Sequence, residues 1–338
     1  MQPATNEFEY TRKRYGKGFQ YFDAISLQKI ACKKKLKSIK GIVIPPMWEE
    51  VFITLHVKAK IVAVGRDAKG RKQYIYSEVW TAQQQAQKFS KLVAFASELP
   101  DMRKTCRAAL KEPVWSRQKV VALMVLILDE TGIRIGNKRY SQENDSYGLS
   151  TLRRRHFIDM NSEDHAENHH VATFDFTGKS GKHRTVSIDD SVLAQHIKES
   201  SQLPGYNLFR YQKSSNKHSF SDVCSDDVNE FIKTQMGDSF SCKDFRTWTG
   251  TCLAAEYYWE TLSNNTANKR KKLENIVIEK VAKTLGNTPA ICREYYIHPT
   301  LLAKIEKRKL GDEPVGNAST EDVCKLSSLE KFVLDNIE

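Results

Sequence analysis

The apolar residues of this 338-residue chain change their spacing near Thr81, and this change constrains the fold more than any other feature. Before Thr81 come short β-type runs separated by turn signals: GIVIPPMW, EVFITLHV, KIVAVG and KQYIYS. Pro45 and Pro46 make the first of these an edge strand or a loop. After it, four apolar residues recur at the i, i+3, i+4, i+7 spacing of one helix face: Phe89, Leu92, Val93 and Ala96. The pattern predicts a small antiparallel β domain over residues 1–80 and a larger, mainly helical domain over residues 81–310.

The helical domain contains one strand-like interruption. The segments HHVATFDF and RTVSI flank the sequence GKSGKH, so together they predict a β-hairpin. Four basic residues crowd its turn: Lys179, Lys182, His183 and Arg184. Further on, Gly286 is placed as a helix C-cap, and residues 311–338 are expected to form an accessory C-terminal tail. The fold class is therefore α+β, with an N-terminal antiparallel sheet and a mainly helical larger domain that carries a small hairpin sheet.

The chain is strongly basic, with 53 Lys and Arg residues against 41 Asp and Glu residues and a formal net charge of +12. A field of this sign favours a polyanionic partner, which is most often nucleic acid and sometimes a membrane surface. The alternative is that the charge serves solubility alone.

Several classes of protein are disfavoured. The longest apolar run, VVALMVLIL from Val120 to Leu128, has about half the length of a membrane-spanning helix and predicts a buried core helix. The N-terminal sequence lacks the apolar region of a signal peptide, so we expect a soluble intracellular protein. The seven cysteines are scattered without C-x-x-C spacing, which indicates neither a zinc site nor a disulfide framework.

One histidine cluster has the spacing of helical metal ligands: His165, His169 and His170. It lies in the polar run NSEDHAENHH between two strand-like segments, so a solvated loop is favoured over a metal site. No carboxylate pair accompanies the basic motifs of the chain, and we therefore expect no metal and no other cofactor.

Three cations lie beside glycines or helix ends: Arg134 in TGIRIGNKRY, Lys179 in FTGKSGK and Arg246 in KDFRTWTGT. Each could contact a phosphate, but each alone is weak evidence because Arg and Lys are usually solvated surface residues. Asn287 follows in a G-N-T-P turn, and Tyr296 comes nine residues later. The order of all five residues is far more specific than any one of them.

Seven segments, spread over nearly the whole chain, resemble the small type IB DNA topoisomerases of poxviruses, large DNA viruses and bacteria. They are GIVIPPMWEEV, GRDAKGRKQYIY, TGIRIGNKRY, YGLSTLRRRHF, FTGKSGK, KDFRTWTGT and LGNTPAICREYYIHP. The resemblance makes Tyr296 the nucleophile and Tyr295 a packing neighbour, while Lys243 matches a residue that assists proton transfer in the poxvirus enzymes. The other members of the catalytic pentad that it implies are Arg134, Lys179, Arg246 and Asn287.

Asn287 is a departure from the poxvirus pattern, which has His in a G-H-T-P turn. Asn can donate a hydrogen bond to a phosphate oxygen but cannot bring positive charge, so this contact is weaker or more purely positional. Bacterial members of the family resemble this chain in having Asn there, and the implied function is therefore unchanged.

The resemblance implies that Tyr296 attacks a phosphodiester of double-stranded DNA, forming a 3′-phosphotyrosine and releasing a 5′-hydroxyl. Arg134 and Arg246 would clamp the phosphate oxygens, where charge develops in the transition state, and Lys179 would protonate the leaving oxygen. Religation is the reverse reaction and needs no ATP. We therefore expect relaxation of both positive and negative supercoils.

The resemblance and the basic β domain together suggest that a monomer closes around the duplex as a clamp. Eight residues are expected to contact DNA: Arg66, Lys69, Arg71, Tyr74, Tyr76, Lys138, Arg139 and Tyr140. The alternative for each of them is an ordinary solvated surface residue.

Two rival functions remain. Tyrosine site-specific recombinases share the order Arg, Lys, Arg, Tyr, but they usually carry H-x-x-R where this chain has KDFR, and they lack the IPPxW β domain. A non-catalytic basic DNA-binding protein is supported by charge alone and leaves the ordered motifs unexplained. The expected setting is a virion, a viral factory or a bacterial cytoplasm.

Overall fold

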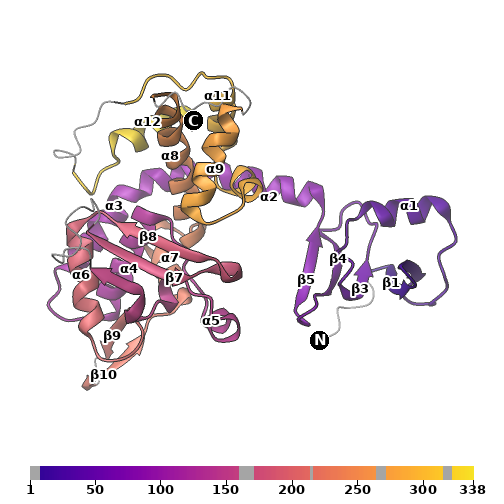
Figure 1. Ribbon diagram of the computed structural model, residues 1–338, viewed down its shortest axis with the longest axis horizontal. Coiled ribbons are helices and arrows are strands. Elements are labelled where there is room, and N and C mark those ends of the chain that lie inside the picture. Colours follow the sequence, from indigo (N-terminus) through magenta and orange to yellow (C-terminus); the bar gives the residue numbers. More distant parts are fainter. Residues whose placement is uncertain (1–7, 160–170, 214–215, 264–271, 315–321) are drawn as a thin grey trace. The chain divides into compact units, whose positions relative to one another are not determined.

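The computed structural model describes residues 8–159, 171–213, 216–263, 272–314 and 322–338 (Figure 1). The chain divides into two compact units, Met1–Lys88 and Phe89–Glu338. The division falls within helix α2 (Glu78–Ser90), which also contains Thr81, the boundary predicted from the sequence.

The first unit is built on a five-stranded antiparallel sheet with the strand order β2-β1-β3-β4-β5. Its elements are β1 (Tyr10–Tyr15), β2 (Gly18–Asp23), α1 (Lys33–Gly41), β3 (Glu49–Ile53), β4 (Ile61–Arg66) and β5 (Lys72–Tyr76). The core is small, with Ile39 of α1 packed on the sheet residues Val51, Ile53 and Ala63.

Residues 42–48, which hold the sequence IVIPPMW, form a loop and not a strand. Pro45 and Pro46 lack the backbone N–H groups that a central strand needs. Arg12 of β1 fixes this loop by donating hydrogen bonds to the carbonyls of Ile44, Pro45 and Trp48 at 2.9–3.1 Å.

The second unit is mainly helical (Figure 1). Its longer helices are α3 (Leu92–Leu110), α4 (Arg117–Thr131), α6 (Ser191–Gln202), α7 (Ser225–Met236), α8 (Cys242–Ser263) and α9 (Leu273–Leu285). Shorter helices are α5 (Lys138–Asn144), α10 (Pro289–Tyr295), α11 (Pro299–Glu306) and α12 (Ser328–Ile337). Ten consecutive residues of α4, from Lys119 to Leu128, are buried, which confirms the predicted core helix.

Two small sheets complete the second unit. The strands β6 (Phe157–Asp159), β7 (Ala172–Thr177) and β8 (His183–Ile188) form an antiparallel sheet, and β9 (Arg210–Lys213) pairs with β10 (Asn216–Asp222). The pairing of β7 with β8 confirms the predicted hairpin, and its turn closes with a hydrogen bond of 2.7 Å from the Gly178 N–H to the Lys182 carbonyl. The α+β fold class predicted from the sequence is confirmed.

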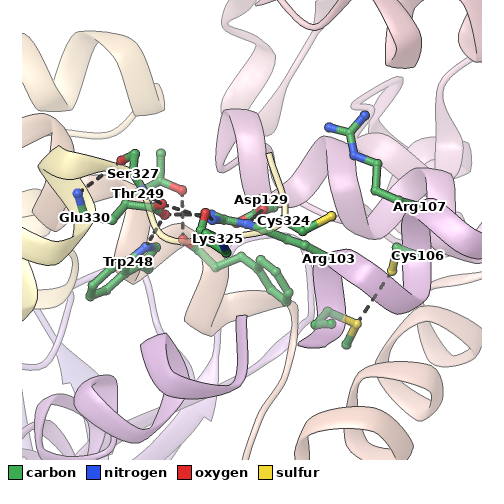
Figure 2. A network of polar contacts seen from close by, with 12 residues as sticks. Arg103, Cys106, Arg107, Asp129, Trp248, Thr249, Cys324, Lys325, Ser327 and Glu330 are labelled. Carbon is green, nitrogen blue, oxygen red and sulfur yellow. Dashed lines mark hydrogen bonds and ion pairs between the residues drawn. The ribbon is translucent and has the colours of Figure 1, made fainter. Parts of the chain in front are cut away.

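Helix α12, in the segment expected to be an accessory tail, packs within the second unit. Helix α12 packs against α8 and α11, and its residues Val333 and Ile337 are buried. Figure 2 shows the polar network that fixes it: Glu330 of α12 accepts hydrogen bonds from Arg103 of α3 at 2.6 Å and from the Trp248 indole of α8 at 2.9 Å. The weak amphipathic pattern of residues 322–338 did not reveal partners so distant in the sequence.

Candidate active site

The carbonyl end of helix α9 organises the candidate site. A helix leaves its last carbonyls without intrahelical donors and carries partial negative charge at that end. The helix stops at Gly286, which has a left-handed φ of 62° and confirms the predicted C-cap. Three arginines from different elements donate hydrogen bonds to four consecutive carbonyls, namely Arg184 of β8 to Lys283 and Thr284, Arg246 of α8 to Leu285, and Arg134 to Gly286.

Arg246 is the most deeply buried of the three, with 5% of its surface exposed. It lies in the first half of α8, where the nearby residues Phe245 and Trp248 are also buried. Its guanidinium bridges the carbonyls of Gly132, at the end of α4, and Leu285, at the end of α9. Arg246 therefore joins three helices at the point where the candidate nucleophile lies.

Arg134 lies in the loop that leaves α4. Gly132 ends that helix in the left-handed conformation, with a φ of 58°, and turns the chain toward α9. The Arg134 carbonyl accepts a hydrogen bond from the Leu149 N–H at 2.8 Å, which holds the loop in place. The Arg134 side chain then donates to the Gly286 carbonyl at 3.1 Å and to the Asn287 amide oxygen.

Tyr296 follows α10 directly and is half-buried. Its ring centroid lies 5.1 Å from the guanidinium carbon of Arg246. The close approach depends on Gly250 of α8, because a Cβ atom there would lie 2.5 Å from the Tyr296 carbonyl oxygen and 3.2 Å from its Cβ. The glycine of the TGT sequence thus allows the tyrosine backbone to contact helix α8, one turn after Arg246.

The site carries excess positive charge. Burial lowers the pKa of Arg134, Arg184 and Arg246, and repulsion from Arg134 lowers the pKa of the other two further. All three remain protonated at neutral pH because the ordinary pKa of arginine is above 12. Within the described residues, these arginines donate to backbone carbonyls and to the amide oxygen of Asn287, Arg246 also hydrogen-bonds the Tyr296 side chain, and no carboxylate pairs with any of the three.

Two buried donors at the site lack oxygen or nitrogen acceptors among the described residues: Arg246 Nε, and Asn287 Nδ2, beside which lies only the weak thiol acceptor of Cys292. Buried polar groups in folded proteins are nearly always hydrogen-bonded, so unpaired donors beside uncompensated cations suggest a missing anionic ligand. A phosphodiester group has several acceptor oxygens and a negative charge, and it fits these requirements.

The structure thus brings together four of the predicted site residues, which are Arg134, Arg246, Asn287 and Tyr296. Lys179 lies exposed at the turn of the β7–β8 hairpin, and Lys243 lies exposed on α8, one turn before Arg246. In the part of the chain that the structure describes, neither lysine side chain makes a hydrogen bond or an ion pair with those four residues. Both can reach a substrate only from the solvent side.

The sequence placed Arg184 near the hairpin turn but did not identify it as a site residue. Its place five residues after Lys179, on the same hairpin, was the available signal, but a basic residue near a turn is usually solvated. Its acceptors are carbonyls 99 and 100 residues further along the chain, so the contact could not be found from local pattern.

The predicted DNA contacts of the first unit lie on or beside β4 and β5. Tyr74 and Tyr76 are exposed by 43% and 45% on one face of β5, with ring centroids 6.4 Å apart. Arg66 and Arg71 are paired with acidic neighbours at 2.7 and 2.8 Å, and Lys69 is exposed in the turn between the strands. The two tyrosines offer an aromatic surface, and a DNA phosphate would compete with carboxylates for the two arginines.

The predicted contacts of the second unit lie on α5. Lys138 is exposed, and Arg139 forms an exposed ion pair with Glu143 at 2.7 Å. The side chain of Tyr140 lies outside the described part of the structure, as do the three histidines of the HAENHH sequence, His165, His169 and His170.

The described residues contain no group of three or more His, Cys, Asp or Glu side chains that could hold a metal ion. Among the helices of the same residues, none has the length and apolar character needed to cross a membrane. All seven cysteines are free thiols.

Comparison with known families defines the class of the protein. Residues 70–313 match the family described as eukaryotic DNA topoisomerase I, catalytic core, and residues 18–67 match the bacterial DNA topoisomerase IB, N-terminal domain. The chain belongs to the type IB DNA topoisomerase family, and it is therefore an isomerase that acts on DNA.

Individual relatives place the chain among the small members of this family. The DNA topoisomerase 1B of Acanthamoeba polyphaga mimivirus is 27% identical over 291 residues, which cover 85% of this chain and 84% of the relative. The DNA topoisomerase 1B of Vaccinia virus (strain Copenhagen) is 23% identical over 267 residues, which cover 78% of this chain and 77% of the relative. Each match thus covers most of both chains.

Proposed function

We propose that this enzyme relaxes positive and negative supercoils by transient cleavage of one DNA strand, with Tyr296 as the nucleophile. Tyr296 attacks the phosphodiester, a 3′-phosphotyrosyl bond forms, and the 5′-oxygen of the next nucleotide leaves. The observation that carries this proposal is the position of the Tyr296 ring beside the buried, carboxylate-free guanidinium of Arg246.

The two arginines nearest Tyr296 stabilise the transition state in this proposal. Negative charge develops on the non-bridging phosphate oxygens during in-line displacement, and fixed cations placed there act where they lower the barrier most. Arg134 and Arg246 are held by helix-end carbonyls before any substrate arrives, so little reorganisation is needed. Asn287 adds a neutral donor through Nδ2, whose orientation is fixed because its Oδ1 accepts from Arg134.

The lysines serve proton transfer in this proposal. The departing 5′-oxygen needs a proton, and Lys179 supplies it from the hairpin turn while Lys243 assists from α8. Their exposure suits this role, because a general acid on the solvent side can meet a substrate that arrives from there. The phosphotyrosyl ester retains the energy of the broken bond, so religation requires neither ATP nor a metal ion.

Binding to the duplex is the remaining part of the proposal. The exposed Tyr74 and Tyr76, together with the basic residues of the β4–β5 turn and of α5, contact DNA, and a monomer surrounds it as a clamp. The net charge of +12 supports such binding, which should weaken steeply as salt rises.

The test is plasmid relaxation with EDTA and without ATP, using the unmutated protein, Tyr296→Phe and Tyr295→Phe. Denaturant quenching during the reaction traps any covalent adduct between protein and DNA. We expect Tyr296→Phe to lose both relaxation and adduct, while the matched control Tyr295→Phe retains both.

Relaxation by Tyr296→Phe would overturn the assignment of the nucleophile. Binding of DNA by an unmutated protein that forms no adduct would favour the non-catalytic alternative. Relaxation confined to plasmids with one particular site would favour a recombinase. A two-dimensional gel of topoisomers tests whether both signs of supercoil are relaxed.

A further inference from the structure

We propose that Arg184 is a positioning residue, which ties the hairpin turn carrying Lys179 to the end of helix α9 and so places the proton donor. This inference rests on the proposed function, in which Lys179 protonates the leaving oxygen. It concerns a residue that does not itself touch the reacting atoms.

The Arg184 side chain crosses from the hairpin to α9. Arg184 lies opposite Phe176 in the β7–β8 ladder, two pairs from the turn that carries Lys179. Its Nη1 donates to the Lys283 carbonyl at 3.0 Å and its Nη2 to the Thr284 carbonyl at 2.5 Å. The planar fork of arginine can span two consecutive carbonyls, which the single ammonium of lysine cannot do in the same way.

Two glycines make room for this side chain. A Cβ atom at Gly178 would lie 2.8 Å from Arg184 Cγ, and one at Gly286 would lie 2.3 Å from Arg184 Nη1. Gly178 immediately precedes Lys179, and Gly286 immediately precedes Asn287. Arg184 therefore lies between the backbone segments that present two of the proposed functional residues.

The electrostatic environment argues against a residue that only stabilises the fold. Burial lowers the pKa of Arg184 and the charge of Arg134 lowers it further, so its cation is held at an energetic cost. The carbonyls of the α9 terminus compensate this in part. By contrast, His183 on the same hairpin pairs with Asp175 at 2.7 Å in an exposed position and reaches neither α9 nor the arginines in the described residues.

The consequence for the reaction is specific. Loss of Arg184 should free the turn from α9 and reduce proton delivery to the leaving 5′-oxygen, while Tyr296, Arg134 and Arg246 keep their own contacts. General acid catalysis contributes about 10²- to 10⁴-fold, so partial loss of its positioning should slow cleavage roughly 10- to 100-fold.

The experiment measures single-turnover cleavage of a duplex by full-length variants, with oxygen or sulfur as the 5′-bridging atom. In both substrates a phosphorus–oxygen bond to Tyr296 forms. With oxygen, the bond from phosphorus to the 5′-oxygen breaks and the oxygen takes a proton. With sulfur, the phosphorus–sulfur bond breaks and the thiolate departs without needing one.

We expect Arg184→Ala to slow cleavage of the oxygen substrate and to approach the unmutated rate with the sulfur substrate. The same pattern is expected of Lys179→Ala. Arg134→Ala should be slow with both substrates because it lacks stabilisation of the phosphate oxygens. Lys182→Ala is the matched control, since it removes a positive charge from the same turn without removing a contact to α9, and it should cleave normally.

A second variant protects the test against misfolding. Gly178→Ala retains Arg184 but pushes on its stem, and it should show a smaller defect that sulfur also restores. Equal slowing of Arg184→Ala on both substrates, or none on either, would overturn the inference while leaving the proposed function intact. Failure of the unmutated protein to cleave either substrate would overturn the proposed function and this inference together.

Discussion

Two arginine clusters of the second unit differ in the groups that neutralise their positive charge. Arg103 contacts Asp129 and Glu330, both at 2.6 Å (Figure 2). Although burial acts to lower its pKa, the two carboxylates raise it above the ordinary value. Arg134 and Arg246 donate to carbonyls and to an amide oxygen, no carboxylate pairs with them in the described residues, and burial lowers the pKa of both.

The difference separates a structural cluster from a functional one. A buried charge is costly unless it is paired, and the Arg103 cluster meets this requirement within the protein. The Arg134 and Arg246 cluster leaves the counter-charge to a ligand, which is the arrangement expected where a phosphate binds. The same residue type therefore serves two purposes, and its neighbours decide which.

The two clusters are also connected through shared helices. Asp129 lies in the last turn of α4, just before the loop to Arg134, and Trp248 lies two residues after Arg246 on α8. Glu330 contacts Arg103 and Trp248, so the C-terminal helix helps to fix the helices from which the functional arginines project.

The largest effect is expected from Arg246→Ala. Removing a cation from the developing charge should lower the cleavage rate by roughly 10³-fold or more. Because this change also relieves repulsion with Arg134, it should destabilise the fold less than Arg103→Ala does. Single-turnover cleavage and urea unfolding are measured for both variants. A lower unfolding free energy for Arg246→Ala than for Arg103→Ala would contradict the distinction between the two clusters.

Arg103→Ala should lower the unfolding free energy more than it lowers the cleavage rate. It leaves Asp129 and Glu330 buried together without a cation, and breaking such a buried pair costs about 3–5 kcal/mol. Urea unfolding measures this loss. The triple variant Arg103→Met, Asp129→Asn, Glu330→Gln removes every charge of the cluster and should recover much of it. Equal instability of the triple variant would show that shape, and not charge, dominates there.

Glu130 is a carboxyl group whose charge is not neutralised either. Its Oε2 atom is buried and accepts no hydrogen bond within the described residues. Burial raises its pKa to about 7, although hydrogen bonds from the backbone of Asp189 and Asp190 oppose the shift. The unfolded chain ionises near pH 4.5 while the folded chain retains the proton, so the stability contributed by Glu130 is present below pH 4.5 and is lost as pH rises toward 7.

Glu130→Gln should remove this pH dependence. Between pH 5 and pH 8 the unmutated protein should lose up to about 3 kcal/mol more unfolding free energy than the variant. Urea unfolding at both values measures the difference, with the exposed Glu143→Gln as control. Parallel curves for Glu130→Gln and the unmutated protein would contradict the proposed ionisation.

The smallest effect is expected from Glu143→Gln itself. Its ion pair with Arg139 is exposed and joins residues one helical turn apart, so its loss should change the unfolding free energy by about 0.5 kcal/mol or less. Release of Arg139 should slightly strengthen DNA binding at low salt, as measured by filter binding. Loss of more than about 1 kcal/mol would show that exposed pairs contribute more here than their solvation allows.

Strands β1 and β2 and the packing of helix α12 were not predicted from the sequence, and both depend on partners far away in the chain. Strands β1 and β2 carry the sequence YTRKRYGKGFQYFD, in which Arg12 takes an inward position that an apolar residue would ordinarily fill. A charged residue at this position interrupts the alternation of apolar and polar residues that indicates a half-buried strand. The Arg12 guanidinium is buried because it donates hydrogen bonds to three carbonyls of a distant loop. The C-terminal helix was taken as accessory for the same reason, because Glu330 meets Arg103 across 227 residues.

The sequence by itself determined the local elements and the order of the candidate residues. The spacing of apolar residues, the glycines of turns and the helix caps are signals that extend over a few residues. They predicted the β7–β8 hairpin, the buried helix α4 and the end of α9 at Gly286. The tertiary structure alone decided which arginines are neutralised. The carboxylates of Arg103 lie 26 and 227 residues away, and the carbonyls of Arg246 lie 114 and 39 residues away. Burial and hydrogen bonding depend on distance in space, which local pattern does not contain.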